Sequence, residues 1–235
     1  MNFISVKTYD ELSRRSADLI AGLIRLKPAC VLGLATGSSP IGTYDTLVRY
    51  YEAGTLDFSS VTSVNLDEYV GLDGTNDQSY RYFMDKHLFN RVNIDPAKTF
   101  VPDGCTKDPA ASGRAYDEMI RKLGGIDLQL LGIGPDGHIG FNEPAPCFIA
   151  PTHEVVLDES TIEANSRFFA DKNDVPRKAI TMGMMSIMQA KKILLIASGE
   201  MKKAVVKKAF EGDVDPMLPA SVLQLHPDVT VIVSD

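Results

Sequence analysis

The sequence predicts an α/β fold with a doubly wound, mostly parallel sheet and helices on both faces. Strand-like and helix-like segments alternate along all 235 residues, the strand-like segments are continuous apolar runs, and no linker or repeat interrupts the order. Continuous apolar strands are typical of parallel sheets, because helices cover both faces of such a sheet. We therefore expect a single Rossmann-like domain over residues 1–235.

Capping signals and periodicity define the first elements. A strand is expected at residues 3–6, and the helix after it opens with the spacing of a capping box, Thr8-x-x-Glu11, followed by leucines at helical intervals. The apolar run at residues 30–35 predicts the second strand. A helix is expected over residues 41–54, where a glycine can end it.

The order of strand followed by loop recurs further along the chain. We expect strands at residues 61–66, 126–134 and 192–197, and a last strand at residues 228–233. Loops that leave the carboxyl ends of parallel strands lie at one edge of the sheet, and ligands bind there beside the switch point of the strand order. Four of the expected loops can therefore converge on one site.

The composition excludes several classes of protein. With 44% apolar and 23% charged residues, the chain resembles an average globular protein, which argues against general disorder, collagen and coiled coil. A net charge of −7 without a basic run argues against nucleic acid as a partner. Cys30, Cys105 and Cys147 form no CxxC pair, which favours reduced thiols over a disulfide framework or a zinc site. We find neither a signal-peptide pattern nor an apolar stretch of the ~18 residues that a membrane span needs, so we expect a cytoplasmic protein.

The loop after the second expected strand has the features of an anion site. Thr36, Gly37, Ser38, Ser39 and Pro40 lead into a helix, whose free N–H groups and dipole would favour a phosphate. An ordinary helix N-cap is the alternative, since Ser followed by Pro is a common helix start. The segment matches neither the Walker spacing nor GxGxxG, which argues against an NTPase or a dinucleotide enzyme.

Two acidic residues, Asp67 and Glu68, follow the third expected strand. A carboxylate at the water-poor edge of a sheet can acquire a pKa suited to proton transfer, so either residue could be a general base. A solvated turn acid is the alternative.

The loop after residues 126–134 is the most informative segment. Asp136, His138 and Glu143 lie within eight residues, separated by glycines that let the backbone bend. Two acids and an imidazole can orient one another and relay a proton. A metal site is the alternative, but one histidine and two carboxylates at this spacing match no recognised ligand pattern, so we expect no metal.

Cations form a fourth candidate cluster. Arg167, and Lys202 and Lys203 after the 192–197 strand, could clamp a phosphate beside the sheet edge through charge-assisted hydrogen bonds. For the lysines, a solvated helix face is the alternative. The methionine-rich run at residues 182–188 is interpreted as core packing and not as a metal or cofactor site.

These motifs together resemble one known family. TGSSP, NLDEYVGL, LGIGPDGHIGFNEP, ANSRFF, SGEMKKA and SVLQLHP occur in the order and spacing of the glucosamine-6-phosphate deaminase (glucosamine-6-phosphate isomerase) family, across nearly the whole chain. The resemblance implies an enzyme that converts glucosamine 6-phosphate and water to fructose 6-phosphate and ammonia. Ring opening, aldose-ketose isomerisation and deamination would proceed without a metal or an organic cofactor.

The resemblance also implies roles for matching positions. Asp67 would take the proton from C2 of the opened sugar and return one at C1, through an enolamine. His138 would assist ring opening, with Asp136 and Glu143 orienting it. The phosphate would be held by the first loop and two cations, namely Thr36, Gly37, Ser38, Ser39, Arg167 and Lys203.

Two departures from the family pattern bear on regulation. The chain ends at Asp235, soon after its last strand, whereas longer relatives carry a C-terminal extension. Allosteric hexameric relatives present basic and hydroxyl residues just beyond the FNEP motif for an effector phosphate. Here residues 146–155 read PCFIAPTHEV, in which Pro146, Cys147, Ile149, Pro151 and Val155 offer little to a dianion. We therefore expect a monomer or small homo-oligomer that no effector activates.

Two other functions are compatible with parts of the pattern. A 6-phosphogluconolactonase has a related fold and a DGH loop, but its motif continues toward SLFP and not FNEP, so Glu143 discriminates between the two activities. A non-catalytic sugar-phosphate sensor is the second alternative, because a fold alone does not establish catalysis.

Overall fold

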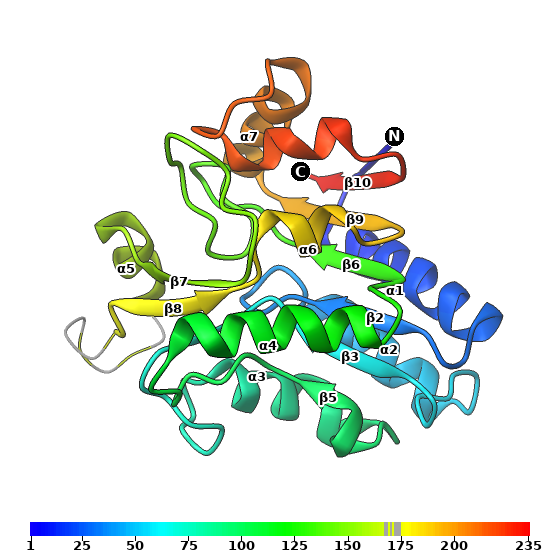
Figure 1. The fold of residues 1–235 in the computed structure, drawn as a ribbon. Helices are drawn as coiled ribbons and strands as arrows, with labels where there is room; N and C mark the ends of the chain where they lie inside the picture. Colours follow the sequence, from blue (N-terminus) through cyan, green and yellow to red (C-terminus); the bar gives the residue numbers. More distant parts are fainter. Residues whose placement is uncertain (167–168, 170, 172–174) are drawn as a thin grey trace.

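A parallel sheet of seven strands forms the centre of the computed structural model, which describes residues 1–166, 169, 171 and 175–235 (Figure 1). Each pair of neighbouring strands runs parallel. In spatial order the strands are β1 (Asn2–Val6), β10 (Val229–Ser234), β9 (Ile193–Ser198), β6 (Leu128–Leu131), β2 (Val31–Leu34), β3 (Thr62–Asn65) and β5 (Thr99–Phe100).

The strand order reverses between β2 and β6. From β2 the chain winds outward to β3 and β5, and from β6 it winds the other way to β9 and β10. Side chains of α1, α2 and α3 pack in the core on one face of the sheet, and those of α4, α6 and α7 pack on the other. The predicted doubly wound, Rossmann-like fold is confirmed.

The helices lie between the strands in chain order, and within the described residues none is long and apolar enough to cross a membrane. They are α1 (Tyr9–Leu26), α2 (Ile41–Glu52), α3 (Tyr80–His87), α4 (Pro109–Lys122), α5 (Glu159–Ser166), α6 (Met184–Met188) and α7 (Glu200–Glu211), with short 3₁₀ helices η1 (Phe89–Arg91), η2 (Pro96–Lys98) and η4 (Pro219–Leu225).

A second, antiparallel sheet of three strands was not predicted from the sequence. β4 (Asp67–Tyr69) follows β3 after a single residue, leaves the main sheet and pairs with β8 (Lys178–Thr181), which pairs in turn with β7 (His153–Val156). Asp67, Thr181 and His153 lie in one row across these strands. Strands of three or four residues are too short to show a clear alternation of apolar and polar residues.

The element ends agree with the local signals in the sequence. Thr8 is the N-cap of α1, and its Oγ1 accepts the N–H of Glu11 at 3.1 Å, as the capping spacing predicted. Gly54 lies just beyond α2 with a φ of 69°, a conformation that favours glycine. β6 is shorter than the expected strand at residues 126–134, because a glycine-rich loop already begins at Gly132.

The methionine-rich segment packs in the core, as predicted. Met182 and Met184 are buried in the cluster between the sheet and the helices α4, α6 and α7, whereas Met185 is exposed. The unbranched thioether side chains fill space within this cluster.

Two neighbouring residues of α1, Leu19 and Ile20, lie on opposite sides of the boundary between surface and core. Ile20 is fully buried against the sheet, while its neighbour Leu19 is 41% exposed. Ile20→Ala should lower the free energy of unfolding by about 2–5 kcal/mol, because it leaves a cavity in a packed core. Leu19→Ala should cost less than about 1 kcal/mol. Urea unfolding of both variants measures the difference, and equal losses would contradict this account of the core.

Candidate active site

A cavity of about 330 Å³ opens at the carboxyl edge of the sheet, beside the β2–β6 switch point. Its walls come from the loops after β2, β3 and β6 and from the start of α7, the loops that the sequence analysis expected to converge. The lining residues that carry polar or aromatic groups are Thr36, Ser38, Ser39, Asp67, Tyr80, Asp136, His138, Phe141 and Lys202.

Asp67 is the buried acid of this cavity. It opens β4, where its side chain is only slightly exposed and the backbone of Gly140 packs beside it. Burial, together with the charge of neighbouring Glu68, raises the pKa of Asp67 to about 8. No described residue donates a hydrogen bond to its carboxylate. Asp67 can therefore exchange a proton near neutral pH.

Glu68 has a different, structural role. Its carboxylate accepts the N–H groups of Tyr69 at 2.8 Å, Tyr80 at 2.9 Å and Arg81 at 2.9 Å, so it binds the start of α3. Burial raises the pKa of Glu68, and the three N–H donors oppose this shift. Of the two acids that the sequence analysis left open as a general base, the structure thus places Asp67 at the cavity.

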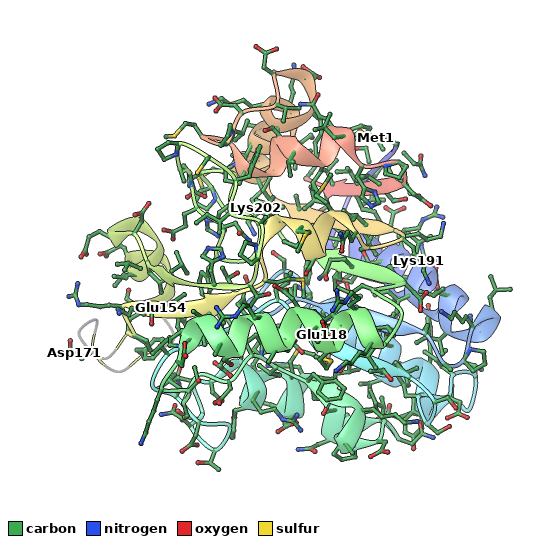
Figure 2. The ribbon with its side chains drawn as sticks, viewed as in Figure 1. Met1, Glu118, Glu154, Asp171, Lys191 and Lys202 are labelled. Atoms are coloured by element: carbon green, nitrogen blue, oxygen red, sulfur yellow. The ribbon has the colours of Figure 1, made fainter. Side chains whose placement is uncertain are left out.

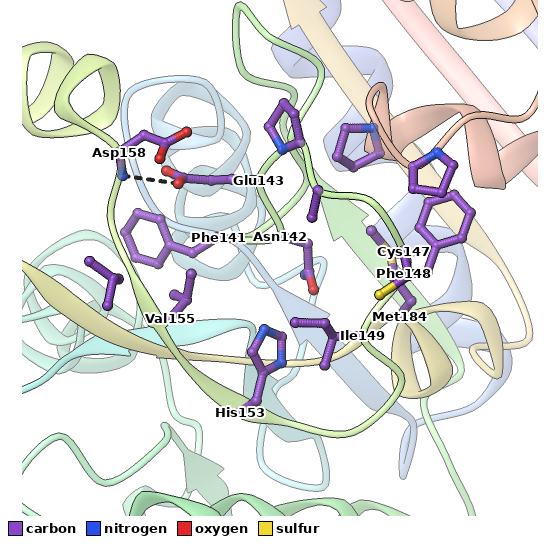
Figure 3. A pocket seen from close by; sticks show the side chains of 15 residues that line it. Phe141, Asn142, Glu143, Cys147, Phe148, Ile149, His153, Val155, Asp158 and Met184 are labelled. Atoms are coloured by element: carbon purple, nitrogen blue, oxygen red, sulfur yellow. Dashed lines mark hydrogen bonds between the residues drawn. The ribbon is translucent and has the colours of Figure 1, made fainter.

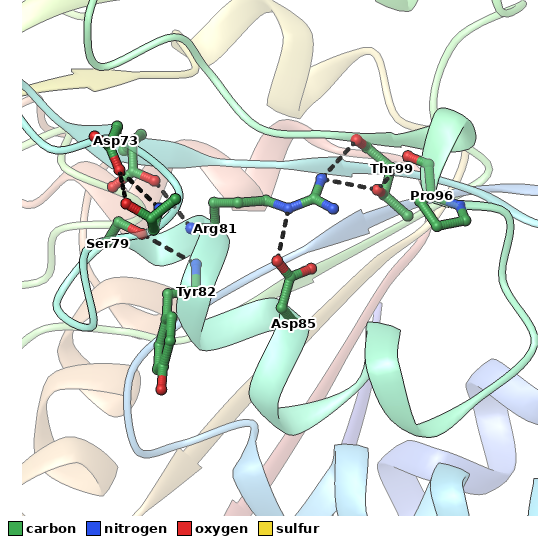
Figure 4. A network of polar contacts seen from close by, with 9 residues as sticks. Asp73, Ser79, Arg81, Tyr82, Asp85, Pro96 and Thr99 are labelled. Atoms are coloured by element: carbon green, nitrogen blue, oxygen red, sulfur yellow. Dashed lines mark hydrogen bonds and ion pairs between the residues drawn. The ribbon is translucent and has the colours of Figure 1, made fainter.

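Further contacts fix the same helix start (Figure 4). The hydroxyl of Ser79 accepts the N–H of Tyr82 at 3.0 Å. The guanidinium of Arg81 donates to Asp85 on its own helix at 3.1 Å and to the hydroxyl of Thr99 at 2.9 Å. α3 is therefore tied both to β5 and to Glu68, and it holds Tyr80 at the cavity wall.

Asp136 and His138 form the pair that the sequence predicted. The Nδ1 atom of His138 lies 2.7 Å from Oδ1 of Asp136, and the N–H of His138 donates to the same oxygen at 3.1 Å. Although burial opposes it, contact with His138 holds the pKa of Asp136 below its usual value. Gly134 makes this geometry possible, because a Cβ there would lie only 2.2 Å from the imidazole ring. The bend at Gly137, with a φ of 88°, also requires glycine.

Glu143 lies at a neighbouring cavity of about 200 Å³ (Figure 3). Its Oε2 accepts the N–H of Asp158 at 3.0 Å, and Cys147, Ile149 and His153 line the same cavity. The proposed orientation of His138 by Glu143 stays a prediction. The Asp136–His138 contact is the part of the predicted triad that the described geometry brings together.

The loop between β2 and α2 lines the cavity with Thr36, Gly37, Ser38 and Ser39. Gly37 has a φ of 85°, which allows the tight turn, and Pro40 precedes α2 without a side-chain cap. Lys202 (labelled in Figure 2) donates from Nζ to Oγ of Ser39 at 2.9 Å. The ammonium of Lys202 therefore lies near the start of α2, and both groups favour a bound anion.

Lys202, and not Lys203, is among the residues that line this cavity. The Nζ atom of Lys203 lies 2.5 Å from Oδ1 of Asp235 and 3.5 Å from Glu200, and its side chain does not line the cavity. Successive residues of a helix point about 100° apart, so only one of two adjacent lysines can face the loop. Of the adjacent pair, Lys202 lines the cavity, and a role of Lys203 in binding phosphate stays a prediction. Arg167 lies outside the described residues, and its role stays a prediction.

An aromatic wall at this site was missed by the sequence analysis. The rings of Tyr80 and Phe141 stack with centroids 5.9 Å apart and an interplanar angle of 13°. Burial raises the pKa of Tyr80 well above its usual value, so its hydroxyl stays protonated. Phe141 belongs to the FNEP motif, but Tyr80 follows no pattern that would mark it, since its position depends on the tie between Glu68 and α3.

Comparison with known proteins decides the family. The family model described as glucosamine-6-phosphate isomerases/6-phosphogluconolactonase matches residues 5–232. This chain belongs to that family. It is 60% identical to a glucosamine-6-phosphate deaminase of Lachnoclostridium phytofermentans, over 99% of this chain and 98% of the relative. It is 55% identical to a glucosamine-6-phosphate deaminase of Clostridium perfringens, over 100% of this chain and 97% of the relative.

Solved structures of the family show the same fold. A monomeric glucosamine-6-phosphate deaminase superposes with a TM-score of 0.97 at 44% identity, covering 100% of this chain and 97% of that one. A 6-phosphogluconolactonase of Shewanella baltica superposes with a TM-score of 0.78 at 22% identity, covering 100% and 98%. The second likeness shows the shared fold alone.

The burial of Asp67 predicts how stability depends on pH. The pKa of Asp67 is about 8 in the folded protein and has its ordinary value of 3.8 in the unfolded chain. Between pH 3.8 and about 8, the folded state therefore binds a proton that the unfolded state has released. This group therefore makes the free energy of unfolding fall as the pH rises from about 4 to about 8. Asp67→Asn should remove that part of the slope in urea unfolding across this range. Asp213→Asn, at an exposed carboxylate, is the control, and an unchanged slope in Asp67→Asn would contradict the assignment.

Proposed function

We propose that this protein converts glucosamine 6-phosphate and water to fructose 6-phosphate and ammonia. One arrangement carries the proposal: a buried carboxylate, Asp67, and the Asp136–His138 pair share a cavity with an anion-binding loop. The loop and Lys202 suit a phosphate, while the carboxylate and the imidazole suit proton transfers. Relatives named glucosamine-6-phosphate deaminase at up to 60% identity support it.

Ring opening would be the first step. The imidazole of His138 would move a proton between the C1 hydroxyl and the ring oxygen of the pyranose, so that the C1–O5 bond breaks and the aldehyde forms. The carboxylate of Asp136, 2.7 Å from Nδ1, would fix the orientation of the ring and stabilise its protonated form. The sugar has the same atoms before and after this step.

Isomerisation and deamination would follow at Asp67. The carboxylate would take the proton from C2, giving an enolamine, and return a proton to C1. The product carries an imine at C2, which water hydrolyses to the ketone of fructose 6-phosphate with release of ammonia. A pKa of about 8 suits this base, because a carboxylate of higher proton affinity removes a proton from carbon more effectively.

The phosphate would bind at the far end of the cavity. Backbone N–H groups of Thr36, Gly37, Ser38 and Ser39 and the ammonium of Lys202 would hold it, and Arg167 would complete the site as the sequence resemblance implies. Lys202 replaces Lys203 in this assignment, because it contacts Ser39. No metal or organic cofactor enters the proposed steps.

We also propose that the protein is a monomer or small homo-oligomer in the cytoplasm, with hyperbolic kinetics, and that it binds neither nucleic acid nor membranes. The likeness to a monomeric deaminase supports the first point. The second cavity, where residues 146–155 lie, has no lysine or arginine among its described lining residues, which argues against an effector phosphate there.

A coupled assay for ammonia and fructose 6-phosphate tests the reaction. Asp67→Asn keeps the shape of the side chain and removes the base, so kcat should fall by roughly 10²- to 10⁴-fold while the substrate still binds. Near-normal turnover of this variant would refute the role of Asp67. Hydrolysis of 6-phosphogluconolactone without ammonia release from glucosamine 6-phosphate would favour the lactonase.

The two adjacent lysines provide a matched pair for the phosphate site. Lys202→Ala should raise KM for glucosamine 6-phosphate by roughly 10- to 100-fold, because a charge-assisted contact of about 1.5–3 kcal/mol is lost. Lys203→Ala removes a surface ion pair with Asp235 and should leave KM within about twofold. Steady-state kinetics of both variants decide between them, and a larger effect at Lys203 would reverse the assignment.

A further inference from the structure

One tyrosine hydroxyl contacts two carbonyl oxygens of the loop at residues 36–40 and one N–H group of α2. Tyr9, the first residue of α1, donates from Oη to the carbonyl oxygens of Ser38 and Ser39, both at 3.1 Å. The same oxygen accepts the N–H of Gly42, in the first turn of α2, at 2.9 Å. Tyr9 lies outside the motifs of the family resemblance and does not line the cavity.

These contacts determine which way two loop peptides point, Ser38–Ser39 and Ser39–Pro40, of which only the first has an N–H group. In a trans peptide the C=O and N–H groups point in opposite directions. Because the carbonyl of Ser38 points toward Tyr9, the N–H of Ser39 points away from it. Lys202 contacts the side chain of Ser39, so this residue is held through its peptide by Tyr9 and through its hydroxyl by a cation.

A carbonyl oxygen turned toward a phosphate would repel it, so the loop needs its carbonyls fixed elsewhere. Tyr9 binds two of them, and no described residue accepts the N–H groups of Gly37, Ser38 and Ser39. At the other end of the loop, the buried hydroxyl of Tyr44 donates to the carbonyl of Ala35 at 2.5 Å.

We propose that Tyr9 is a positioning residue for the sugar phosphate, which orients the 36–40 loop so that its N–H groups, and not its carbonyl oxygens, meet the anion. The inference rests on the proposed function, because it concerns the same phosphate site. Tyr9 acts through the loop and touches neither the substrate nor the reacting atoms.

A second tyrosine at the same helix pair supplies a control. Tyr50 of α2 donates to Oδ1 of Asp18 on α1 at 2.7 Å, and like Tyr9 it is half-buried. It joins the same two helices without contacting the loop. Any effect that comes only from loosening α1 against α2 should therefore appear in Tyr50→Phe as well as in Tyr9→Phe.

Two measurements on the full chain test the proposal: the Kd of inorganic phosphate by calorimetry, and the steady-state KM and kcat for glucosamine 6-phosphate. In Tyr9→Phe, the phosphate Kd and the sugar KM should rise together, by roughly five- to tenfold, as expected when a hydroxyl that joins several backbone groups is lost. The kcat should stay within about twofold. Tyr50→Phe should leave all three values within about twofold.

Three outcomes would overturn the proposal. An unchanged phosphate Kd in Tyr9→Phe would show that the hydroxyl is structural only. An equal rise in Tyr50→Phe would assign the effect to the helix pair, and a wild-type protein that does not bind phosphate would show that the loop is no anion site. The phosphate Kd does not depend on turnover, so a failure to release ammonia would count against the proposed function and leave the test of Tyr9 intact.

Discussion

The pairing of β2 with β6 in the middle of the sheet is the constraint on which the site depends. After β2 the chain continues to β3 on one side, and after β6 it continues to β9 on the other side. The loops that follow β2 and β6 therefore run in opposite directions and leave room between them. At this pairing Gly33 leaves room for the buried side chain of Gln129 on β6, since a Cβ there would lie 2.0 Å from Oε1 of Gln129. A glycine in a buried strand, ordinarily a weakness, here accommodates a side chain of the neighbouring strand.

From this junction, the chain places two adjacent carboxylates in opposite environments. Glu68 receives three backbone N–H groups and anchors a helix, whereas Asp67 is buried without a donor among the described residues and keeps a high proton affinity. The charge of Glu68 adds to the effect on Asp67. The strand of three residues that carries both acids turns one toward the cavity and the other toward α3, as alternation along a strand requires.

Features that depend on residues close together in the chain could be predicted from the sequence. Parallel strands, the capped first helix and the loops at the sheet edge could be predicted because each follows from residues close together in the chain. The contact of Asp136 with His138 is local in the same sense. The small antiparallel sheet, the tie between Glu68 and α3, and the position of Tyr80 could not be predicted, because they depend on partners 11 to more than 100 residues away. Which of the two adjacent lysines lines the cavity could not be predicted for a related reason, since it depends on the rotation of α7 relative to a distant loop.

The rotation of α7 about its axis affects how the cavity at the sheet edge can change in evolution. The position of α7 that lines the cavity is set by its distance from the end of β9, and Gly199 with its φ of 93° lies just before the helix. Loss of one residue in the first turn would carry Lys203 to the place that Lys202 occupies, with the charge at the site unchanged. A deletion could thus be neutral here although it shifts the alignment. Among diverged sequences, the lysine equivalent to Lys202 is better identified by counting from the strand end than by matching neighbouring letters.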